Sequence, residues 1–324
     1  MLLSPNLTAS HPLALTLASV GLAVALSACG NDNDMPDVPV TPDAPTTLAC
    51  PTRDVPNPEE QTLPCCYRLS QADQLDAPEL RLTFLNIVEP AGSNLAGDLV
   101  GPLLNTSIRT ELFQWLFRAE GADADGDIAI TTGFGRRNAT TGNYAFSTGA
   151  APDMPGWAPV TLNGTLTGET ISTEPFDGVL TVPIFDESAT TVQIELQLTA
   201  VRVLSSTLSE SRSCIGTLLS PTRYMTGATL GGFVTVASAN AGEIMFTGVN
   251  ATLCGVIAGS LSDGDYCTAT PQGDWTVPPD SRCDGNVCFQ NGDGGTCDPA
   301  IDGVGGCNAW YLEANFAAAG VNIE

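Results

Sequence analysis

The feature that most constrains the fold of this chain is a series of short segments in which apolar and polar residues alternate. The clearest is TVQIELQLTAVRV at 191–203, where one face carries Val192, Ile194, Leu196 and Leu198. A period of two with one polar face is typical of an antiparallel strand that has water on one side. The segment therefore predicts a sheet whose other face covers a core.

Similar strand signals recur along the chain. The segment ELRLTFLNIV at 79–88 places Leu80, Leu82 and Phe84 on one predicted face. Further segments have the same character, at 127–133, 144–148, 160–172, 178–185 and 230–237. Turn-forming residues separate the strands, at Thr141-Gly142-Asn143, Asn163-Gly164 and Asp177-Gly178. Many short strands at regular spacing favour a β-sandwich or a barrel.

One segment breaks this pattern and predicts an amphipathic helix over about 98–111. Apolar residues recur there at a spacing of four, at Val100, Leu104, Ile108 and Leu112. The next residues, LFQWLFR at 112–118, either extend this helix or begin a strand. The helix either covers the sheet as part of the core or helps to enclose a lipid, and the first arrangement is favoured.

The chain has 11 cysteines, and their positions favour disulfides over a zinc site. If Cys29 carries a lipid, two groups of five remain. The first group is Cys50, Cys65, Cys66, Cys214 and Cys254. The second group is Cys267, Cys283, Cys288, Cys297 and Cys307. Because both groups are odd, complete pairing requires at least one disulfide between them. The single pairing that we favour is Cys214–Cys254.

Residues 1–28 have the character of a signal peptide, although no Lys or Arg precedes their apolar run at 12–28. That run is short for a membrane span, and it ends in LSAC at 26–29, which resembles the bacterial lipobox. We therefore expect lipid on Cys29, which gives stable anchoring to a membrane. Gly30 stands where an Asp would retain a lipoprotein in the inner membrane. The predicted location is the outer membrane, on its periplasmic or its outward face.

Residues 29–64 predict a tether between this anchor and the folded body. Prolines recur every third residue, which is the period of polyproline II, at Pro36, Pro39, Pro42 and Pro45. Aspartates between them keep the segment solvated. The β-rich body follows at 65–262.

The C-terminal part divides into a loop and a strand. Residues 263–308 contain eight Asp, five Cys and many Gly, without an apolar period. We expect a disulfide-held loop there, because the segment cannot bury a core of its own. Alternation returns at 309–324, with one face made of Trp310, Leu312, Ala314 and Phe316. This segment predicts a final strand that rejoins the body.

The acidic loop is the main candidate for a metal site, because a hard cation such as Ca²⁺ relieves the repulsion between crowded carboxylates. The candidate ligands are Asp280, Asp284, Asn286, Asp293 and Asp298, with Asn291 and Asp302 also in the loop. A solvated acidic loop without a metal is the favoured interpretation.

A second oxygen-rich motif, DADGD at 123–127, begins like a calcium-binding loop. Ile128 and Phe134 stand where that motif needs Gly and Glu. A hairpin turn between strands is therefore favoured.

The charged residues exclude several classes of function. The 36 acidic residues outnumber 11 basic ones, all of them Arg, and the net charge of −25 disfavours a nucleic-acid partner. The single histidine, His11, lies in the predicted signal peptide, so the mature chain has neither His nor Lys. Catalysis that needs a histidine or lysine base is excluded, and we expect no enzyme.

The enzymatic alternative is a carboxylate-dependent glycan hydrolase, which needs two carboxylates converging in a cleft about 5–10 Å apart. The candidate sugar platforms are Trp115, Trp157, Trp275 and Trp310, although core packing is favoured for most of them. Among so many carboxylates no pair stands out, and no catalytic residue is predicted.

Four short motifs carry a resemblance to other proteins: CCYR at 65–68, APELR at 77–81, SESRSCIG at 209–216 and CNAW at 307–310. In these motifs the chain resembles uncharacterised lipoproteins of myxobacterial type. The resemblance implies a predicted lipoprotein without a known role, and it implies no catalytic residues.

The expected fold is therefore mainly β, an antiparallel sandwich or barrel with one amphipathic helix and a cysteine-rich C-terminal loop. The expected function is that of a lipoprotein of the cell envelope, anchored by its lipid, with a binding or structural role. A lipid-binding carrier is the other alternative, and it requires an apolar cavity beside the helix at 98–111. No cofactor is required, and the sequence does not identify a protein or glycan partner.

Overall fold

The computed structural model describes residues 71–96, 100–150, 153–185, 192–220, 223–246, 249–260, 266–290, 297 and 306–324. The predicted signal peptide, the lipidation site Cys29, the tether at 29–64, and Cys50, Cys65 and Cys66 lie outside these residues, so what the sequence predicts for them stays a prediction. Within the described ranges, no helix combines the length and the apolar character needed to cross a membrane.

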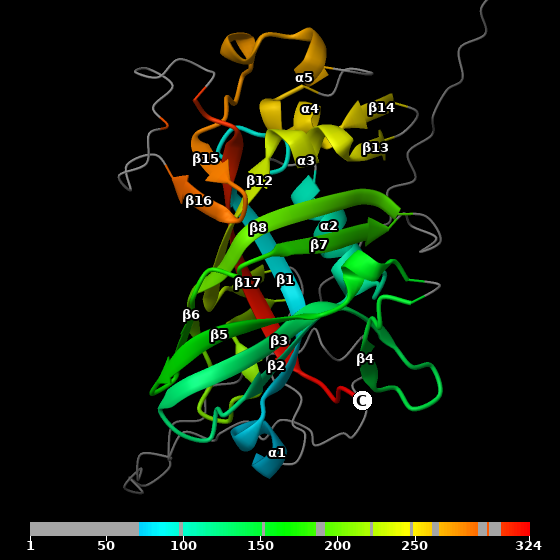
Figure 1. Cartoon of the computed structure of the whole chain (residues 1–324). Helices are drawn as coiled ribbons and strands as arrows, with labels where there is room; N and C mark the ends of the chain where they lie inside the picture. Colours follow the sequence, from blue (N-terminus) through cyan, green and yellow to red (C-terminus); the bar gives the residue numbers. More distant parts are fainter. Residues whose placement is uncertain are drawn as a thin grey trace, which may run out of the picture. The chain divides into compact units, whose positions relative to one another are not determined.

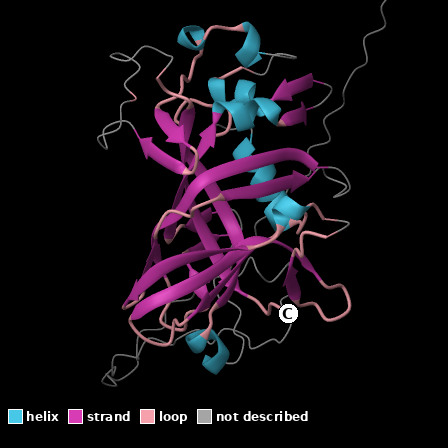
Figure 2. Cartoon of the chain, in the orientation of Figure 1, coloured by secondary structure: helices cyan, strands magenta, loops and turns pink. Residues whose placement is uncertain are grey.

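The fold is a closed barrel of eight antiparallel strands, drawn as arrows in Figures 1 and 2. Neighbours around the barrel follow chain order: β1 (Glu79–Glu89), β2 (Trp115–Glu120), β3 (Gly126–Arg137), β5 (Val160–Thr167), β6 (Thr170–Thr173), β8 (Val192–Thr207), β12 (Ala228–Thr235) and β17 (Ala309–Gly320). Of the two architectures that the strand pattern left open, the chain adopts the barrel. Closure leaves no free edge among these eight strands.

The final strand closes the barrel. β17 pairs with β12 on one side and with β1 on the other, so that Ala314 lies opposite both Leu230 and Ile87. Figure 1 shows β17 in red beside β1 in cyan. The four residues predicted to share one face of this strand all belong to the core: Trp310, Leu312, Ala314 and Phe316.

An irregularity in β1 changes which of its residues face the barrel interior. The register with β17 shifts after Leu82, and the interior is lined by Leu82, Leu85 and Ile87. The predicted grouping of Phe84 with Leu82 is therefore wrong. The cause is a bulge, because one extra residue in a strand reverses the alternation beyond it.

β8 contains two irregularities of the same kind. Leu196 and Leu198 are buried, as the alternation predicts, but the register with β12 then shifts twice. At the first shift Ala200 has φ 51, in the left-handed region that a strand residue rarely adopts. The residues that line the interior become Leu196 and Leu198, then Val201 and Val203, then Ser206 and Leu208.

The predicted turn at Asn163-Gly164 is also wrong, because both residues lie within β5. The hairpin of β5 and β6 turns instead at Gly168, which has φ 61. Glycine is required at position 164 for a steric reason, because a side chain there would collide with the carbonyl of Ser172 on β6. The glycine permits a close approach between two strands rather than a turn.

The predicted amphipathic helix is α2 (Val100–Arg109), and the segment after it forms β2 rather than extending the helix. Its buried face consists of Val100, Leu104 and Ile108. Asn105 fixes the helix to β1, because its amide donates to the Leu85 carbonyl at 2.7 Å and accepts from the Leu85 N–H at 3.0 Å.

Shorter elements surround the barrel. They are α1 (Gln71–Asp76), β4 (Tyr144–Phe146), η2 (Pro155–Trp157), β7 (Val179–Phe185), β9 (Cys214–Ile215), β10 (Thr217–Ser220), β11 (Arg223–Met225), α3 (Val236–Ala241), β13 (Glu243–Phe246), β14 (Val249–Thr252), α4 (Leu253–Ala258), α5 (Tyr266–Ala269), η3 (Gln272–Asp274), β15 (Ser281–Asp284) and β16 (Val287–Gln290). β7 pairs with β8 and adds to the barrel wall. The three short helices α3, α4 and α5 lie together (Figure 1).

The acidic segment at 263–308, expected as a loop, contains regular structure in its described part. α5, η3 and the β15–β16 hairpin all lie within it, and Ser281 of β15 pairs with Ala309 of β17. Trp275 is buried against Trp310, whose indole N–H donates to the Val277 carbonyl at 3.1 Å. The segment has no apolar period because isolated side chains, rather than a repeating face, attach it to the barrel.

Candidate functional site

The interior of the barrel holds an apolar cavity of about 70 Å³. Every barrel strand except β6 contributes described residues to its wall, as does β7, and Val100 and Leu104 of α2 border it on one side. Protein interiors contain few voids larger than a water molecule, which needs about 10–15 Å³. An eight-stranded barrel has an interior of the size that side chains fill or that holds one small ligand. The cavity is therefore the candidate binding site, and it lies beside the predicted helix.

The cavity offers almost no polar group to a ligand. Its one polar lining side chain is Thr132. The Thr132 hydroxyl accepts from the Trp115 indole N–H at 2.8 Å and donates to the Leu116 carbonyl at 3.0 Å. Because its one proton and one of its two lone pairs are already engaged, this hydroxyl offers a ligand no donor and at most one acceptor position. The cavity suits an uncharged, apolar molecule.

The residues that line the cavity were not identified as a site from the sequence. Apart from Leu95, each belongs to a segment in which the apolar pattern predicted a strand or helix, but the bulges in β1 and β8 decide which side chains face inward. A signal was present in Leu85 and Val201, which stand out of phase with the alternation before them. A sequence alone does not show whether such a phase change is a bulge or the end of a strand.

The cavity is not the cleft that a carboxylate-dependent hydrolase needs, because none of the described residues that line it is Asp or Glu. All four tryptophans are buried, and each has at most 7% of its surface exposed: Trp115, Trp157, Trp275 and Trp310. Their rings serve packing rather than offering an open platform for a sugar.

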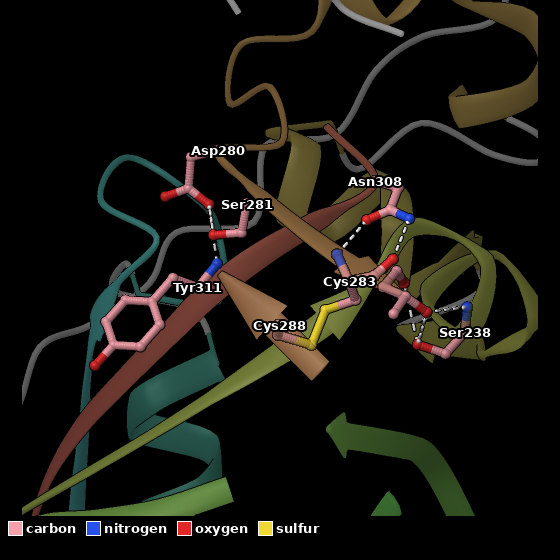
Figure 3. Close-up of a disulfide and its surroundings, with 8 residues drawn as sticks. Ser238, Asp280, Ser281, Cys283, Cys288, Asn308 and Tyr311 are labelled. Carbon is pink, nitrogen blue, oxygen red and sulfur yellow. Dashed lines mark hydrogen bonds between the residues drawn. A yellow bond between two sulfur atoms is a disulfide. The ribbon is translucent and has the colours of Figure 1, made fainter. Parts of the chain in front are cut away.

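Asp280 holds the β15–β16 hairpin against β17 (Figure 3). Its carboxylate accepts from the Tyr311 N–H at 2.9 Å and from the Ser281 hydroxyl at 2.9 Å. Burial raises the pKa of this carboxyl above its ordinary value and outweighs the hydrogen bonds that lower it, and the charge of Glu89 acts in the same direction as burial. These contacts give Asp280 a structural role.

The hairpin itself is closed by the disulfide Cys283–Cys288 (Figure 3). The side chain of Asn308 forms two hydrogen bonds with the backbone of Cys283. The Asn308 amide accepts from the Cys283 N–H at 2.7 Å and donates to the Cys283 carbonyl at 2.8 Å. The disulfide packs over Phe233 and Tyr311 on the outer face of the barrel. This face is distinct from the cavity.

The candidate calcium ligands are not gathered into a site as far as the structure describes them. Asp284 and Asn286 are exposed, and the Asn286 amide donates to Asp177 at 3.1 Å. Among the described residues, no three His, Cys, Asp or Glu side chains are placed to hold a metal. The other candidates lie outside the described residues, so calcium binding there stays a prediction: Asn291, Asp293, Asp298 and Asp302.

The DADGD motif lies where the hairpin connection of β2 and β3 meets β3, with residues 123–125 in the connection and Gly126 and Asp127 at the start of β3, as the turn interpretation predicts. The Asp125 carboxylate accepts from the Gly168 N–H at 2.8 Å. The motif thus joins its own turn to the neighbouring turn of β5 and β6.

Three disulfides lie within the described residues: Cys254–Cys267, Cys283–Cys288 and Cys297–Cys307. The first joins the two cysteine groups, which confirms that the acidic segment is linked to the body. The favoured pairing Cys214–Cys254 is wrong, because Cys254 on α4 faces Cys267 on the adjacent α5. Cys214 is also disulfide-bonded, through another cysteine.

No family model, no curated protein and no solved structure matches this chain.

Proposed function

We propose that this protein is a binding module that takes a small apolar ligand, or the apolar end of a larger one, into its barrel. We further propose that lipid on Cys29 anchors the module to the outer membrane. The observation that carries the binding proposal is the apolar cavity beside α2, with the hydroxyl of Thr132 already satisfied. This arrangement favours the lipid-binding carrier over a purely structural role.

The energetics of the cavity support a ligand. A dry void costs stability at about 24 cal/mol per Å³, so a void of this size costs on the order of 2 kcal/mol. Water recovers little of that cost, because a buried water needs two to four polar partners. An engineered cavity of about 150 Å³ with a similar apolar lining stays dry and binds benzene. An apolar ligand recovers the contacts that the void lacks.

The position of α2 supports the same proposal. Its apolar face borders the cavity, and hydrogen bonds attach it to β1 at two places: Asn105 pairs with Leu85, and the Arg81 guanidinium donates to the Ile108 carbonyl at 3.2 Å. Leu85 is itself a lining residue, so one of these attachments lies in the cavity wall. The helix α2 is therefore the element that covers a ligand inside the barrel.

The test is binding of a neutral apolar dye, Nile red, to the purified protein. Saturable binding with increased emission is expected. Ala314→Leu adds a larger side chain on β17 inside the cavity, and it should abolish dye binding while leaving the melting temperature unchanged or higher. Filling a real void does not incur the cost of overpacking.

The matched control is Ala129→Leu, which makes the same substitution at a half-buried position of β3 that does not line the cavity. It should leave dye binding unchanged. Binding that persists in Ala314→Leu, or no saturable binding by the wild-type protein, would contradict the proposal.

A further inference from the structure

A second, smaller cavity of about 30 Å³ lies in the barrel next to the first. Three residues line both cavities: Phe117 of β2, Val203 of β8 and Phe316 of β17. The rings of Phe117 and Phe316 stack with centroids 5.5 Å apart and 8° between their planes. The stacked pair therefore stands at the boundary between the two cavities.

The smaller cavity contains one polar side chain, Ser206 of β8. Ser206 is 2% exposed, and its hydroxyl has no hydrogen-bond partner within the described part of the chain. The second register shift of β8 brings it inward, two residues before Leu208. A buried hydroxyl is normally satisfied, because leaving it unpaired costs its full desolvation. A single water is a poor partner here, since the other lining side chains are apolar.

We propose that the two cavities are compartments of one tunnel, gated by Phe117 and Phe316, which takes a chain-shaped ligand with a neutral polar end. The apolar chain occupies the larger compartment and displaces the stacked rings, and its polar end pairs with the Ser206 hydroxyl. This inference rests on the proposed function, and it identifies the ligand class as a long-chain alcohol or a similar neutral lipid.

The chemistry of the tunnel separates this class from fatty acids. Among the described residues, none that lines either compartment is basic, so a carboxylate bound there is buried without a counter-charge from them. A ligand hydroxyl either donates to the Ser206 hydroxyl or accepts from it, so one hydrogen bond pairs the two groups without burying a charge. The alcohol should therefore bind more tightly than the carboxylate of equal length at neutral pH.

The test measures how affinity depends on chain length, using straight-chain primary alcohols from hexanol to tetradecanol as competitors of Nile red. In the wild-type protein the affinity should rise by about fourfold for each buried methylene and then level off. Phe117→Ala and Phe316→Ala remove the gate. The chain length at which the affinity stops rising should therefore be longer in these variants. Phe233→Ala is the matched control, because the Phe233 ring packs on Tyr311 outside the tunnel, with the two ring centroids 5.3 Å apart. If Phe117→Ala does not fold, Phe117→Leu replaces it in the same measurement.

The role of Ser206 has its own readout. Ser206→Ala should weaken dodecanol binding by roughly fivefold, the equivalent of one ordinary hydrogen bond, and leave dodecane binding unchanged. Ser213→Ala, at a serine that is buried outside both cavities, should change neither.

The outcomes separate this inference from the function on which it rests. If the wild-type protein binds Nile red and alcohols, but the gate variants keep the same length limit or Ser206→Ala keeps the preference for dodecanol over dodecane, the tunnel is wrong and the apolar binding module stands. If no probe binds the wild-type protein or the gate variants, the proposed function itself is overturned.

Discussion

The indole ring of Trp275 stacks on that of Trp310, with centroids 5.7 Å apart and 21° between their planes. Trp275 belongs to the acidic segment, whereas Trp310 belongs to the strand that closes the barrel. A segment that shows no apolar period in the sequence is thus attached to the body by a pair of buried rings.

Trp275→Ala should lower the free energy of unfolding by about 3–5 kcal/mol, because it removes a large buried ring and leaves a cavity. Urea denaturation followed by fluorescence of the remaining tryptophans measures the loss. Phe289→Ala is the control, since Phe289 is 44% exposed on β16 and should change stability by less than about 0.5 kcal/mol. Equal effects of the two substitutions would mean that the Trp275 stack does not anchor the segment.

Replacing Cys254 and Cys267 together by alanine should cost about 3 kcal/mol, because their disulfide closes a loop with a sequence separation of 13. The Cys283–Cys288 disulfide, with a separation of 5, constrains a shorter loop and should contribute less. Urea unfolding of both double variants provides the comparison, and non-reducing peptide mapping of the wild-type protein identifies its disulfides. A map that lacks a Cys254–Cys267 peptide would contradict the structure of this region.

Stability should depend on pH through Asp280. Because folding raises the pKa of this carboxyl, its contribution to stability is fully present below the unfolded pKa and is lost as pH rises through the folded value. Asp280→Asn stays neutral and keeps an oxygen to accept the hydrogen bonds from Ser281 and Tyr311. The variant should therefore gain stability relative to the wild type as pH rises from about 3 to 7.

Urea midpoints across that pH range measure the Asp280 effect. The control is Asp284→Asn, at an exposed aspartate of the same hairpin. A difference between wild type and Asp280→Asn that stays constant with pH would show that the carboxyl does not titrate differently in the folded protein.

Calcium should change the melting temperature only slightly, because the described part of the acidic segment is held by packing and disulfides. A bound ion at a hundred times its dissociation constant would add roughly 2.7 kcal/mol, which is several degrees for a domain of this size. Differential scanning calorimetry with calcium and with magnesium distinguishes these cases. A rise specific to calcium that disappears in Asp284→Ala with Asp293→Ala would establish a metal site.

Cys29→Ser should abolish correct processing and stable membrane attachment, because the predicted lipid is joined to that sulfur. Partitioning of the variant between detergent and water phases, with mass spectrometry of its N-terminus, measures both effects. A Cys29→Ser chain that is still trimmed before position 29 and stays with the membrane would contradict the lipobox prediction.

The sequence by itself determined the type and approximate position of the main elements. Alternation in β8 and β17 and the spacing of four in α2 are local properties, so the chain shows them without tertiary contacts. With Cys29 set aside for lipid, complete pairing of the two odd cysteine groups likewise required a link such as Cys254–Cys267, because that requirement depends on counting alone.

Only the tertiary structure decided that the strands close into a barrel and which side chains face its interior. Closure depends on pairing β1 with β17, which lie far apart in the chain. The bulges at Ala200 and after Leu82 reverse the alternation, and they are set by pairing with neighbouring strands. The cavity, the gate and the inward position of Ser206 all follow from these pairings, so local pattern did not reveal them.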